Sequence, residues 1–311
     1  MSFELTILGC NSAIPTNHRK PTAQLLNVAE RFFLIDCGEG TQLQLRKYKI
    51  RMQSIQHIFI SHLHGDHYFG LIGFISTMHL LGREKELNIY APAELKEIIY
   101  TQLAASKTEL RFPLFFHEFG FDEPELLMES NDLTVHTIPL SHSLPCCGFL
   151  FQEKTKPRRM RKEKIEEYNI PLDAVPAIKA GGDYLLADGT LVPHIELTRG
   201  AQLPRSFAFC SDTSYNEAII PQIKGVDMLY HEATFLDELK ERARQTMHST
   251  AKEAATIAYK SQVGKLILGH YSQRYFDLSP LLDEAQAVFP DTYLAIEGEK
   301  FELKREYDSD S

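Results

Sequence analysis

Four side chains that can bind a metal ion lie within six residues of one another. They are His62, His64, Asp66 and His67. The apolar segment IQHIFIS, residues 55–61, precedes them, so the chain must turn sharply where a predicted strand ends, and we expect Gly65 to permit that turn. Imidazole nitrogen and carboxylate oxygen suit a borderline cation such as zinc, and the segment has no cysteine of the kind that a structural zinc knuckle uses. The cluster therefore predicts a catalytic metal site.

Further candidates follow other strand-like segments. They are His142 in PLSHS, Asp212 in CSDT, His231 in LYHEAT and His270 in LGHYS. Any one of them alone is more typical of a structural histidine or a helix cap, but their repetition at strand ends favours a shared site at one edge of a sheet. Two metal ions about 3.5–4 Å apart can clamp the entering and leaving oxygens of an in-line displacement. Such a site is suited to phosphodiester hydrolysis.

The elements that would position these residues alternate between strands and helices. Apolar runs that end in polar clusters predict strands in segments 3–9, 32–40, 54–67, 87–92, 133–143, 206–213, 227–234 and 265–272. The helical segments are 41–48, 69–81, 93–106 and 249–262, the last opening with a Ser-Thr cap signal. This order predicts an α/β fold with hairpins mixed in.

The segment from Glu153 to about Thr198 interrupts the alternation. It is highly charged at first and then rich in Pro, Gly and Asp. We interpret residues 153–198 as an arm inserted into a single domain that spans residues 1–311, and not as a second core.

Composition narrows the class of protein. The 311 residues are 43% hydrophobic and 24% charged, which is typical of a soluble globular protein. No apolar run approaches the roughly 18–20 residues that span a bilayer, and the first residues lack the features of a signal peptide, so we expect a cytoplasmic protein without membrane contact. The five cysteines are odd in number and form no CxxC motif, which predicts free thiols, most of them buried.

The net charge of −9 argues against a surface that binds nucleic acid everywhere. Two local basic segments remain, residues 46–51 (RKYKIR) and 156–164 (KPRRMRKEK). Such runs are more often solvated faces, so they only allow local contacts with nucleic acid.

Seven short motifs together resemble the ribonuclease Z family of the metallo-β-lactamase superfamily. They are DCGEGTQ (36–42), SHLHGDH (61–67), PLSHS (139–143), CSDT (210–213), HEATF (231–235), HST (248–250) and GHYSQRY (269–275). The HxHxDH pattern alone indicates only the superfamily, whereas HEAT and HST narrow the resemblance to this family. The match runs in order from residue 8 to residue 303. It implies an αββα sandwich of two mixed sheets flanked by helices, with a protruding arm.

The resemblance also implies the metal ligands. One zinc ion would be held by His62, His64 and His142, and the other by Asp66, His67 and His270. Asp212 would bridge the two ions, giving two zinc ions per subunit. Every residue type matches the family at these positions.

Catalytic and supporting roles follow from the same resemblance. Asp66 would help to orient or deprotonate the attacking hydroxide. His248 would donate a proton to the leaving 3′-oxygen, with Glu232 orienting it; the alternative is that His248 only caps the following helix. Asp36 and His231 would support the metal-binding imidazoles.

RNA contacts and partners are implied in the same way. Residues expected to contact RNA are Arg19, Lys20, Arg158, Arg159, Arg161 and Arg274. The family acts on precursor tRNA and commonly forms homodimers. Its bacterial arm usually has a Gly-Pro-rich turn where this chain reads LDAVPAIKAG, so the grip on tRNA is where this chain departs from the pattern.

The leading hypothesis is an endonuclease that removes the 3′ trailer of precursor tRNA, leaving a 3′-hydroxyl on the tRNA and a 5′-phosphate on the trailer. A hydrolase of the same fold that acts on cyclic nucleotides or other small phosphodiesters would share every metal ligand but need no basic arm. A catalytically idle RNA-binding protein is a third reading, although all the proposed ligands and the proton donor are present.

Overall fold

The computed structural model describes residues 2–308, which divide into two compact units. The first unit contains the described residues of segments 1–129, 134–151 and 206–303, and the second those of segments 130–133, 152–205 and 304–311. Among residues 2–308, no helix is both long enough and apolar enough to cross a membrane. All five cysteines are free and buried, which confirms the prediction made for them.

The first unit contains two seven-stranded mixed sheets. The first sheet has the order β18 (Lys300–Glu302), β1 (Phe3–Gly9), β2 (Ala23–Val28), β3 (Arg31–Ile35), β4 (Ile55–Phe59), β5 (Leu87–Ala91) and β6 (Leu114–Glu118). The second has the order β17 (Thr292–Leu294), β16 (Lys265–Gly269), β15 (Met228–Glu232), β14 (Ser206–Cys210), β9 (Cys147–Glu153), β8 (Leu133–Pro139) and β7 (Leu126–Glu129). Strands β3 to β6 pair in parallel, as do β14 to β17, whereas β18 to β3 and β7 with β8 pair antiparallel.

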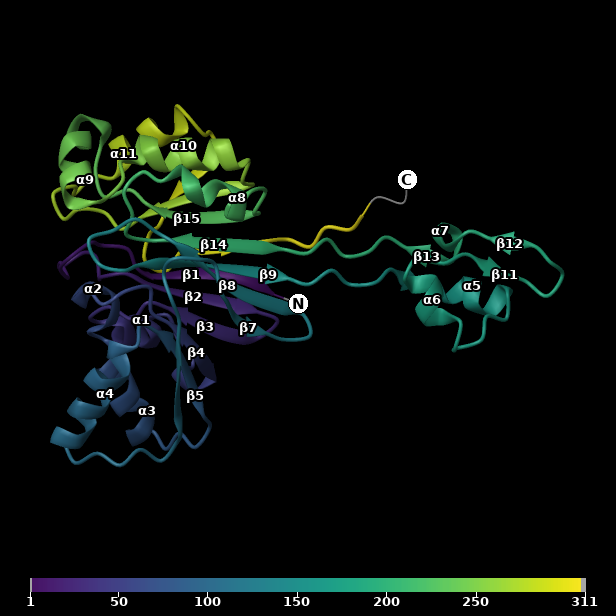
Figure 1. Ribbon diagram of the computed structural model, residues 1–311, viewed down its shortest axis with the longest axis horizontal. Coiled ribbons are helices and arrows are strands. Elements are labelled where there is room, and N and C mark those ends of the chain that lie inside the picture. Colours follow the sequence, from purple (N-terminus) through teal and green to yellow (C-terminus); the bar gives the residue numbers. More distant parts are fainter. Residues whose placement is uncertain (1, 309–311) are drawn as a thin grey trace. The chain divides into compact units, whose positions relative to one another are not determined.

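Helices cover the outer face of each sheet (Figure 1). Those beside the first sheet are α1 (Thr41–Lys47), α2 (Gly65–Tyr68), α3 (Leu71–Leu80) and α4 (Glu94–Ala105). Those beside the second are α8 (Ile220–Ile223), α9 (Lys240–Thr246), α10 (Ala251–Ser261) and α11 (Ser279–Gln286). Short 3-10 helices cover Met52–Ser54, Glu217–Ile219 and Asp237–Leu239. The predicted fold class, two mixed sheets flanked by helices, is confirmed.

Aromatic side chains join the two sheets. The ring of Phe33 lies 5.7 Å from that of Phe151, and the ring of Phe59 lies 5.3 Å from those of Phe149 and Phe151. Rings at these distances bury large apolar areas in offset or edge-to-face contact. The sheets are therefore held together by a rigid layer, from which the polar loops at the strand ends project.

All eight predicted strand segments contain a strand, and all four predicted helices are present. Helix α10 opens with the expected cap: Thr250 Oγ1 accepts the Glu253 N–H at 3.2 Å, and the Glu253 carboxylate accepts the Thr250 N–H at 3.1 Å. This capping box satisfies two backbone donors that the helix leaves free.

The second unit contains short elements only. They are β10 (Arg159–Met160), α5 (Lys162–Glu167), α6 (Val175–Lys179), β11 (Tyr184–Leu185), β12 (Leu191–Val192), α7 (His194–Leu197) and β13 (Thr198–Arg199). Strand β10 pairs with β13, and β11 pairs with β12. Ile170, Ile178, Val192 and Leu197 form a small buried cluster.

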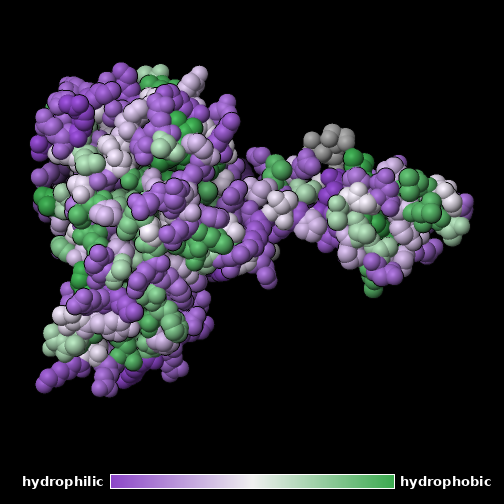
Figure 2. Space-filling view, viewed as in Figure 1, coloured by the Kyte–Doolittle hydropathy of each residue, from purple (hydrophilic) through white to green (hydrophobic). Residues whose placement is uncertain are grey.

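All four residues of this cluster lie inside the 153–198 segment that we interpret as an inserted arm. The four residues lie 8, 14 and 5 positions apart in the sequence, so no helical or strand period marks them. The same unit leaves apolar side chains at its surface, visible as green areas in Figure 2, with Leu172 84% and Leu185 62% exposed.

Candidate metal centre

The residues predicted to bind metal stand just beyond the carboxyl ends of four strands. His62 follows β4, His142 follows β8, Asp212 follows β14 and His270 follows β16 directly. Strands β4 and β16 belong to different sheets. The two sheets therefore bring their polar ends to one place, and the structure gathers all seven predicted residues there.

A first group consists of three imidazoles and one carboxylate. His64 Nδ1 lies 3.0 Å from His62 Nε2 and 3.1 Å from His142 Nε2. Asp212 Oδ2 lies 3.8 Å from His62 Nε2 and 3.6 Å from His142 Nε2. Four potential donor atoms thus surround one small volume.

A second group stands on the other side of Asp212. Its Oδ1 atom lies 3.1 Å from Nε2 of both His67 and His270. Asp66 Oδ2 lies 3.5 Å from each of the same two nitrogens. The two oxygens of Asp212 therefore face different groups, as a bridging carboxylate requires.

Four of the imidazoles direct Nδ1 away from the centre to a hydrogen-bond partner. The partners are Ser61 Oγ for His62 (3.0 Å), Asp36 Oδ2 for His67 (2.7 Å), the Met247 carbonyl for His142 (2.9 Å) and Thr234 Oγ1 for His270 (3.0 Å). A proton on Nδ1 leaves Nε2 with a free lone pair that points inward. His64 is the exception, since its Nδ1 faces the centre.

Two buried atoms test whether a cation fits. Nε2 of His67 and Nε2 of His270 are both buried without a hydrogen-bond partner among residues 2–308. Buried nitrogens are rarely left unpaired, and a metal ion would satisfy both. The donors are nitrogen and oxygen with no thiolate, a set that suits zinc at a catalytic site.

The charges at the centre are strongly coupled. Burial acts against ionisation of Asp66 and Asp212, but the surrounding imidazoles, His67 and His270 among them, hold the pKa of both carboxyls well below the usual range. Burial lowers the pKa of His62, whereas three carboxylates outweigh burial at His67 and raise its pKa, so a cation that binds His67 Nε2 must displace a proton there. Ionised carboxylates are therefore present to receive cations.

His248 and Glu232 form a pair beside the two groups. Glu232 Oε1 accepts the His248 Nδ1–H at 2.8 Å, and the His248 ring lies 5.1 Å from His142 and 5.3 Å from His270. Burial opposes the charged imidazole, but the Glu232 carboxylate raises the pKa of His248 to about 9. At neutral pH this imidazole carries a proton that it could donate.

The two predicted supporting residues differ. Asp36, with a left-handed φ of 55°, accepts hydrogen bonds from the Ser61 N–H (2.8 Å), the Ser61 hydroxyl (3.0 Å) and His67. His231 instead uses Nδ1 for the Glu232 carbonyl at 2.8 Å, and its Nε2 has no partner among residues 2–308. His231 thus makes no hydrogen bond to any of the seven residues.

Some contacts at the centre were not foreseen. Ser61 and Thr234 hold two of the imidazoles, and the Ala13 N–H donates to Asp66 Oδ2 at 2.7 Å. Ser61 and Thr234 lie inside the SHLHGDH and HEATF motifs, which could have signalled them. The main-chain groups of Ala13 and Met247 carry no such signal.

Gly65 serves a different purpose from the one expected. It begins α2 and does not have a left-handed φ. A Cβ atom here would lie 2.1 Å from the ring of Phe69. A larger residue at position 65 would therefore have to displace this ring, while the backbone of Gly65 itself does not use the left-handed region.

A cavity of about 570 Å³ opens onto the centre. His64, Asp66, Asp212, His248 and His270 all line it, together with Arg242 and Arg274. Arg274 was predicted to contact RNA: its Nε donates to Ser272 Oγ at 3.1 Å, and its guanidinium lies 5.1 Å from the Phe235 ring.

The other residues predicted to contact RNA lie elsewhere. Arg19 donates to Asn11 Oδ1 (3.0 Å) and to the Tyr275 carbonyl (2.6 Å) and lines a separate hollow, while Lys20 Nζ donates to the Thr16 carbonyl at 3.2 Å. The structure does not bring Arg19 or Lys20 into the metal-centre cavity.

The three arm arginines lie in the second unit. Arg158 Nε donates to Thr198 Oγ1 at 2.7 Å, and Arg161 Nε donates to the Thr198 carbonyl at 2.9 Å. The Arg159 guanidinium lies 4.8 Å from the Tyr307 ring and is exposed. Two of the three therefore have an internal role that the sequence did not indicate.

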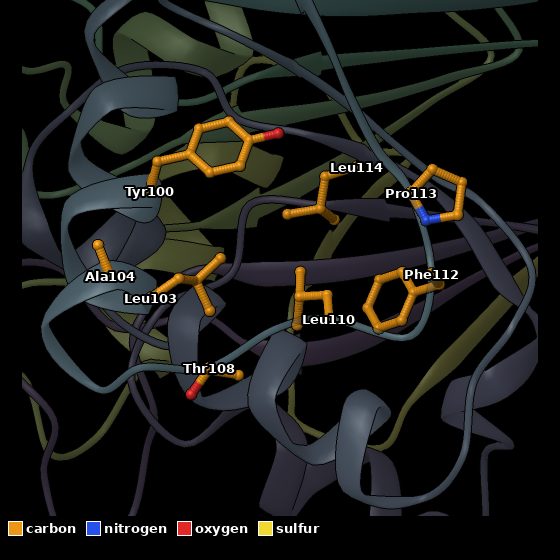
Figure 3. Close-up of a pocket in the computed structure, with 8 residues that line it drawn as sticks. All are labelled: Tyr100, Leu103, Ala104, Thr108, Leu110, Phe112, Pro113 and Leu114. Carbon is orange, nitrogen blue, oxygen red and sulfur yellow. The ribbon is translucent and has the colours of Figure 1, made fainter.

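A further hollow lies between α4 and the segment that leads into β6 (Figure 3). Its lining residues are Tyr100, Leu103, Ala104, Thr108, Leu110, Phe112, Pro113 and Leu114. None of these side chains is acidic, basic or a histidine, so this hollow cannot supply hydrolytic chemistry.

Comparisons with known proteins agree with the geometry. The family model described as "Anti-Pycsar protein Apyc1" matches residues 3–159. Ribonuclease Z of Bacteroides thetaiotaomicron is 47% identical over 295 residues, covering 95% of this chain and 93% of the relative, and ribonuclease Z of Cytophaga hutchinsonii is 47% identical over 97% of this chain and 96% of its own.

Solved structures with a similar fold include a tRNase Z and another metallo-β-lactamase fold protein. The crystal structure of human tRNase Z, short form, has a TM-score of 0.70 at 27% identity, covering 96% of this chain and 98% of its own. The metallo-β-lactamase fold protein YhfI from Bacillus subtilis has a TM-score of 0.68 at 19% identity, covering 97% of this chain and 100% of its own, which supports the fold alone.

Proposed function

Since the chain belongs to the ribonuclease Z family, and over residues 3–159 also to the family of the Anti-Pycsar protein Apyc1, we propose that it cuts precursor tRNA at a centre of two zinc ions. The chain is a hydrolase, an endoribonuclease that removes the 3′ trailer and leaves a 3′-hydroxyl on the tRNA and a 5′-phosphate on the trailer. The observation that carries the proposed mechanism is the bridging position of Asp212 between two groups of donors, with a protonated His248 beside them.

The proposed ligands form two groups, the same two groups that the distances between their donor atoms define. His62, His64 and His142 would hold one ion, and Asp66, His67 and His270 the other, with Asp212 shared. When bound, the ions would stabilise negative charge on the phosphoryl oxygens and allow water to be activated at neutral pH.

Asp66 is proposed to orient the attacking water as well as to bind metal. The Ala13 N–H fixes its Oδ2 atom at 2.7 Å. Because the pKa of Asp66 is held well below its usual range, the carboxylate is a weak base and a permanent acceptor. Of the two roles implied by the family, orientation therefore has the better support.

His248 is proposed to protonate the leaving 3′-oxygen. Glu232 holds the Nδ1–H at 2.8 Å, so Nε2 is the atom left to deliver a proton. Glu232 is fully buried and also accepts hydrogen bonds from the Thr213 N–H (2.7 Å) and the Thr234 hydroxyl (2.6 Å). These bonds fix the carboxylate and thereby the ring that it orients.

A phosphodiesterase acting on small substrates, such as cyclic nucleotides, is the second candidate, because it would use the same ligands. The match to the Apyc1 family model covers residues 3–159 and ends there. Asp212, Glu232, His248 and His270 all lie beyond it, whereas the ribonuclease Z relatives cover these positions as part of 95% of the chain.

The oligomeric state and the way the protein binds tRNA are proposed from the family resemblance alone. We propose a cytoplasmic homodimer in which the arm, residues 153–198, holds precursor tRNA, with Arg159 among its phosphate contacts. Arg19 and Lys20 would act near the RNA end, and Arg274, which lines the cavity, would contact phosphate there.

One assay tests the activity. The zinc-loaded protein and a His64→Ala variant are incubated with a precursor tRNA that carries a 3′ trailer, and the cut and its end groups are mapped. We expect a single cut near the acceptor stem, absent in the variant. Hydrolysis of bis-p-nitrophenyl phosphate with the precursor left intact would support the small-substrate enzyme instead. Zinc near two per chain without turnover on either substrate would point to a catalytically idle binding protein.

A further inference from the structure

Helix α9 contributes an arginine to the wall of the metal-centre cavity. Arg242 and Thr246 both line the cavity, and their spacing of four residues places them on the same face of the helix. Between them, Ala243 is buried, and its carbonyl accepts the His248 N–H at 2.9 Å. The backbone that carries Arg242 therefore also presents the proposed proton donor.

Both ends of α9 are fixed. The helix ends at Thr246, and the next residue, Met247, has a left-handed φ of 54° and a carbonyl that accepts the His142 Nδ1–H at 2.9 Å. At the other end, Lys240 forms an ion pair with Glu253 at 3.2 Å. These contacts flank the backbone of Arg242 in the chain.

The guanidinium of Arg242 has no internal role. It is exposed, and among residues 2–308 it forms no ion pair or side-chain hydrogen bond. Arg244, two residues further on, pairs with Glu241 at 3.0 Å and does not line the cavity. A guanidinium left unpaired in a cavity beside a metal centre is suited to an anion, above all the two oxygens of a phosphate.

We propose that Arg242 binds a backbone phosphate of the RNA strand next to the phosphate that is cut. The proposal rests on the proposed function, in which the metal ions held by the seven ligands would bind the phosphate that is cut. Arg274, proposed above to contact phosphate in the same cavity, already contacts Ser272 and Phe235, whereas Arg242 has no such contact and is available for the neighbouring phosphate. A small phosphodiester has no second phosphate, so Arg242 sets the preference for a polynucleotide.

The test compares Arg242→Ala with Arg244→Ala on precursor tRNA and on bis-p-nitrophenyl phosphate. We expect Arg242→Ala to lower kcat/KM for the precursor roughly 10- to 100-fold, the loss of one charge-assisted hydrogen bond. The slope of log(kcat/KM) against log salt should become shallower by about 0.7–0.9. Hydrolysis of the small ester should stay unchanged, and Arg244→Ala should match the wild type on both substrates.

Several outcomes of the same experiment would contradict the proposed role of Arg242. Equal precursor cleavage by the Arg242→Ala and Arg244→Ala variants would overturn the proposal, as would an equal loss on the small ester, which would indicate damage to the centre. Recovery of the salt slope in Arg242→Lys supports it, because lysine restores the charge. Absence of precursor cleavage by the wild type overturns the proposed function itself, and the assignment of Arg242 with it.

Discussion

The metal centre and the second unit hold their polar side chains in opposite ways. At the centre two supporting carboxylates each have several partners: Asp36 accepts three hydrogen bonds, and Glu232 is bonded to Thr213, Thr234, His248 and Ser249. In the second unit, two arginines share one threonine, and the buried apolar cluster has four residues. Hydrolysis depends on atoms placed to within tenths of an ångström, whereas a grip on phosphates needs only positive charge near the surface.

We expect the largest effect from removal of the Asp212 carboxylate, which lies between the two groups of donors. Replacing Asp212 with Asn leaves one carbonyl oxygen where two carboxylate oxygens face two groups of donors. We expect zinc content to fall by at least one ion per chain, and turnover of both substrates to fall by more than the roughly 10²–10⁴-fold that a proton donor contributes. Metal analysis and kinetics measure the two effects.

Asp227→Asn is the matched control for Asp212→Asn. Asp227 Oδ2 accepts the N–H and hydroxyl of Ser206 at the opposite end of β14. This variant should lower the melting temperature while keeping zinc and activity. If Asp212→Asn behaved in the same way, the bridging role would be wrong.

The second-largest predicted effect on the cleavage rate is the loss of the proposed proton donor, His248. His248→Ala should slow precursor cleavage by roughly 10²–10⁴-fold, but it should affect bis-p-nitrophenyl phosphate much less, because p-nitrophenolate leaves without a proton. Since the pKa of His248 is raised to about 9, wild-type cleavage of the precursor should decline as pH rises through that value. The variant should lack this decline, and an equal loss on both substrates would contradict the role.

Substitutions of Asp36 test how much its hydrogen bond to the proposed ligand His67 contributes to zinc affinity. Loss of its bond to His67 should weaken zinc binding by roughly 10- to 100-fold, measured by chelator competition. Asn tolerates the left-handed φ of 55° and keeps one acceptor oxygen, so Asp36→Asn should be milder than Asp36→Ala. Excess zinc should restore activity in both variants. Activity that zinc cannot restore would place Asp36 in the chemistry itself.

The sequence predicted the centre far better than it predicted the second unit. The proposed ligands could be found because each follows an apolar strand, and strand ends converge. The ring orientations could not be found: only distances show that His64 faces the centre with Nδ1 while His142 uses Nε2 and bonds the Met247 carbonyl. A main-chain acceptor 105 positions away leaves no mark in composition.

In the second unit the basic run was interpreted through its charge alone. Arg158 and Arg161 bond Thr198 across 40 and 37 positions, contacts that no local pattern encodes. The run therefore mixes residues that hold the unit together with residues whose side chains are exposed at its surface. Charge counts cannot separate the two kinds, whereas the hydrogen bonds do.

The smallest predicted effect on precursor binding comes from replacing the exposed basic residues of the second unit. Arg159 is exposed beside Tyr307, and Lys162 is exposed at the start of α5. Replacing Arg159 and Lys162 with Ala should weaken precursor binding only about two- to fivefold, as for other exposed charges, and flatten its salt dependence while sparing the small ester. Replacing Arg158 and Arg161 removes both bonds to Thr198, so it should in addition make residues 152–205 more sensitive to limited proteolysis. Equal sensitivity to proteolysis in the two double variants would mean that the bonds to Thr198 do not hold the second unit together. The second unit would then differ from the metal centre in its internal hydrogen bonds as well as in its surface charges.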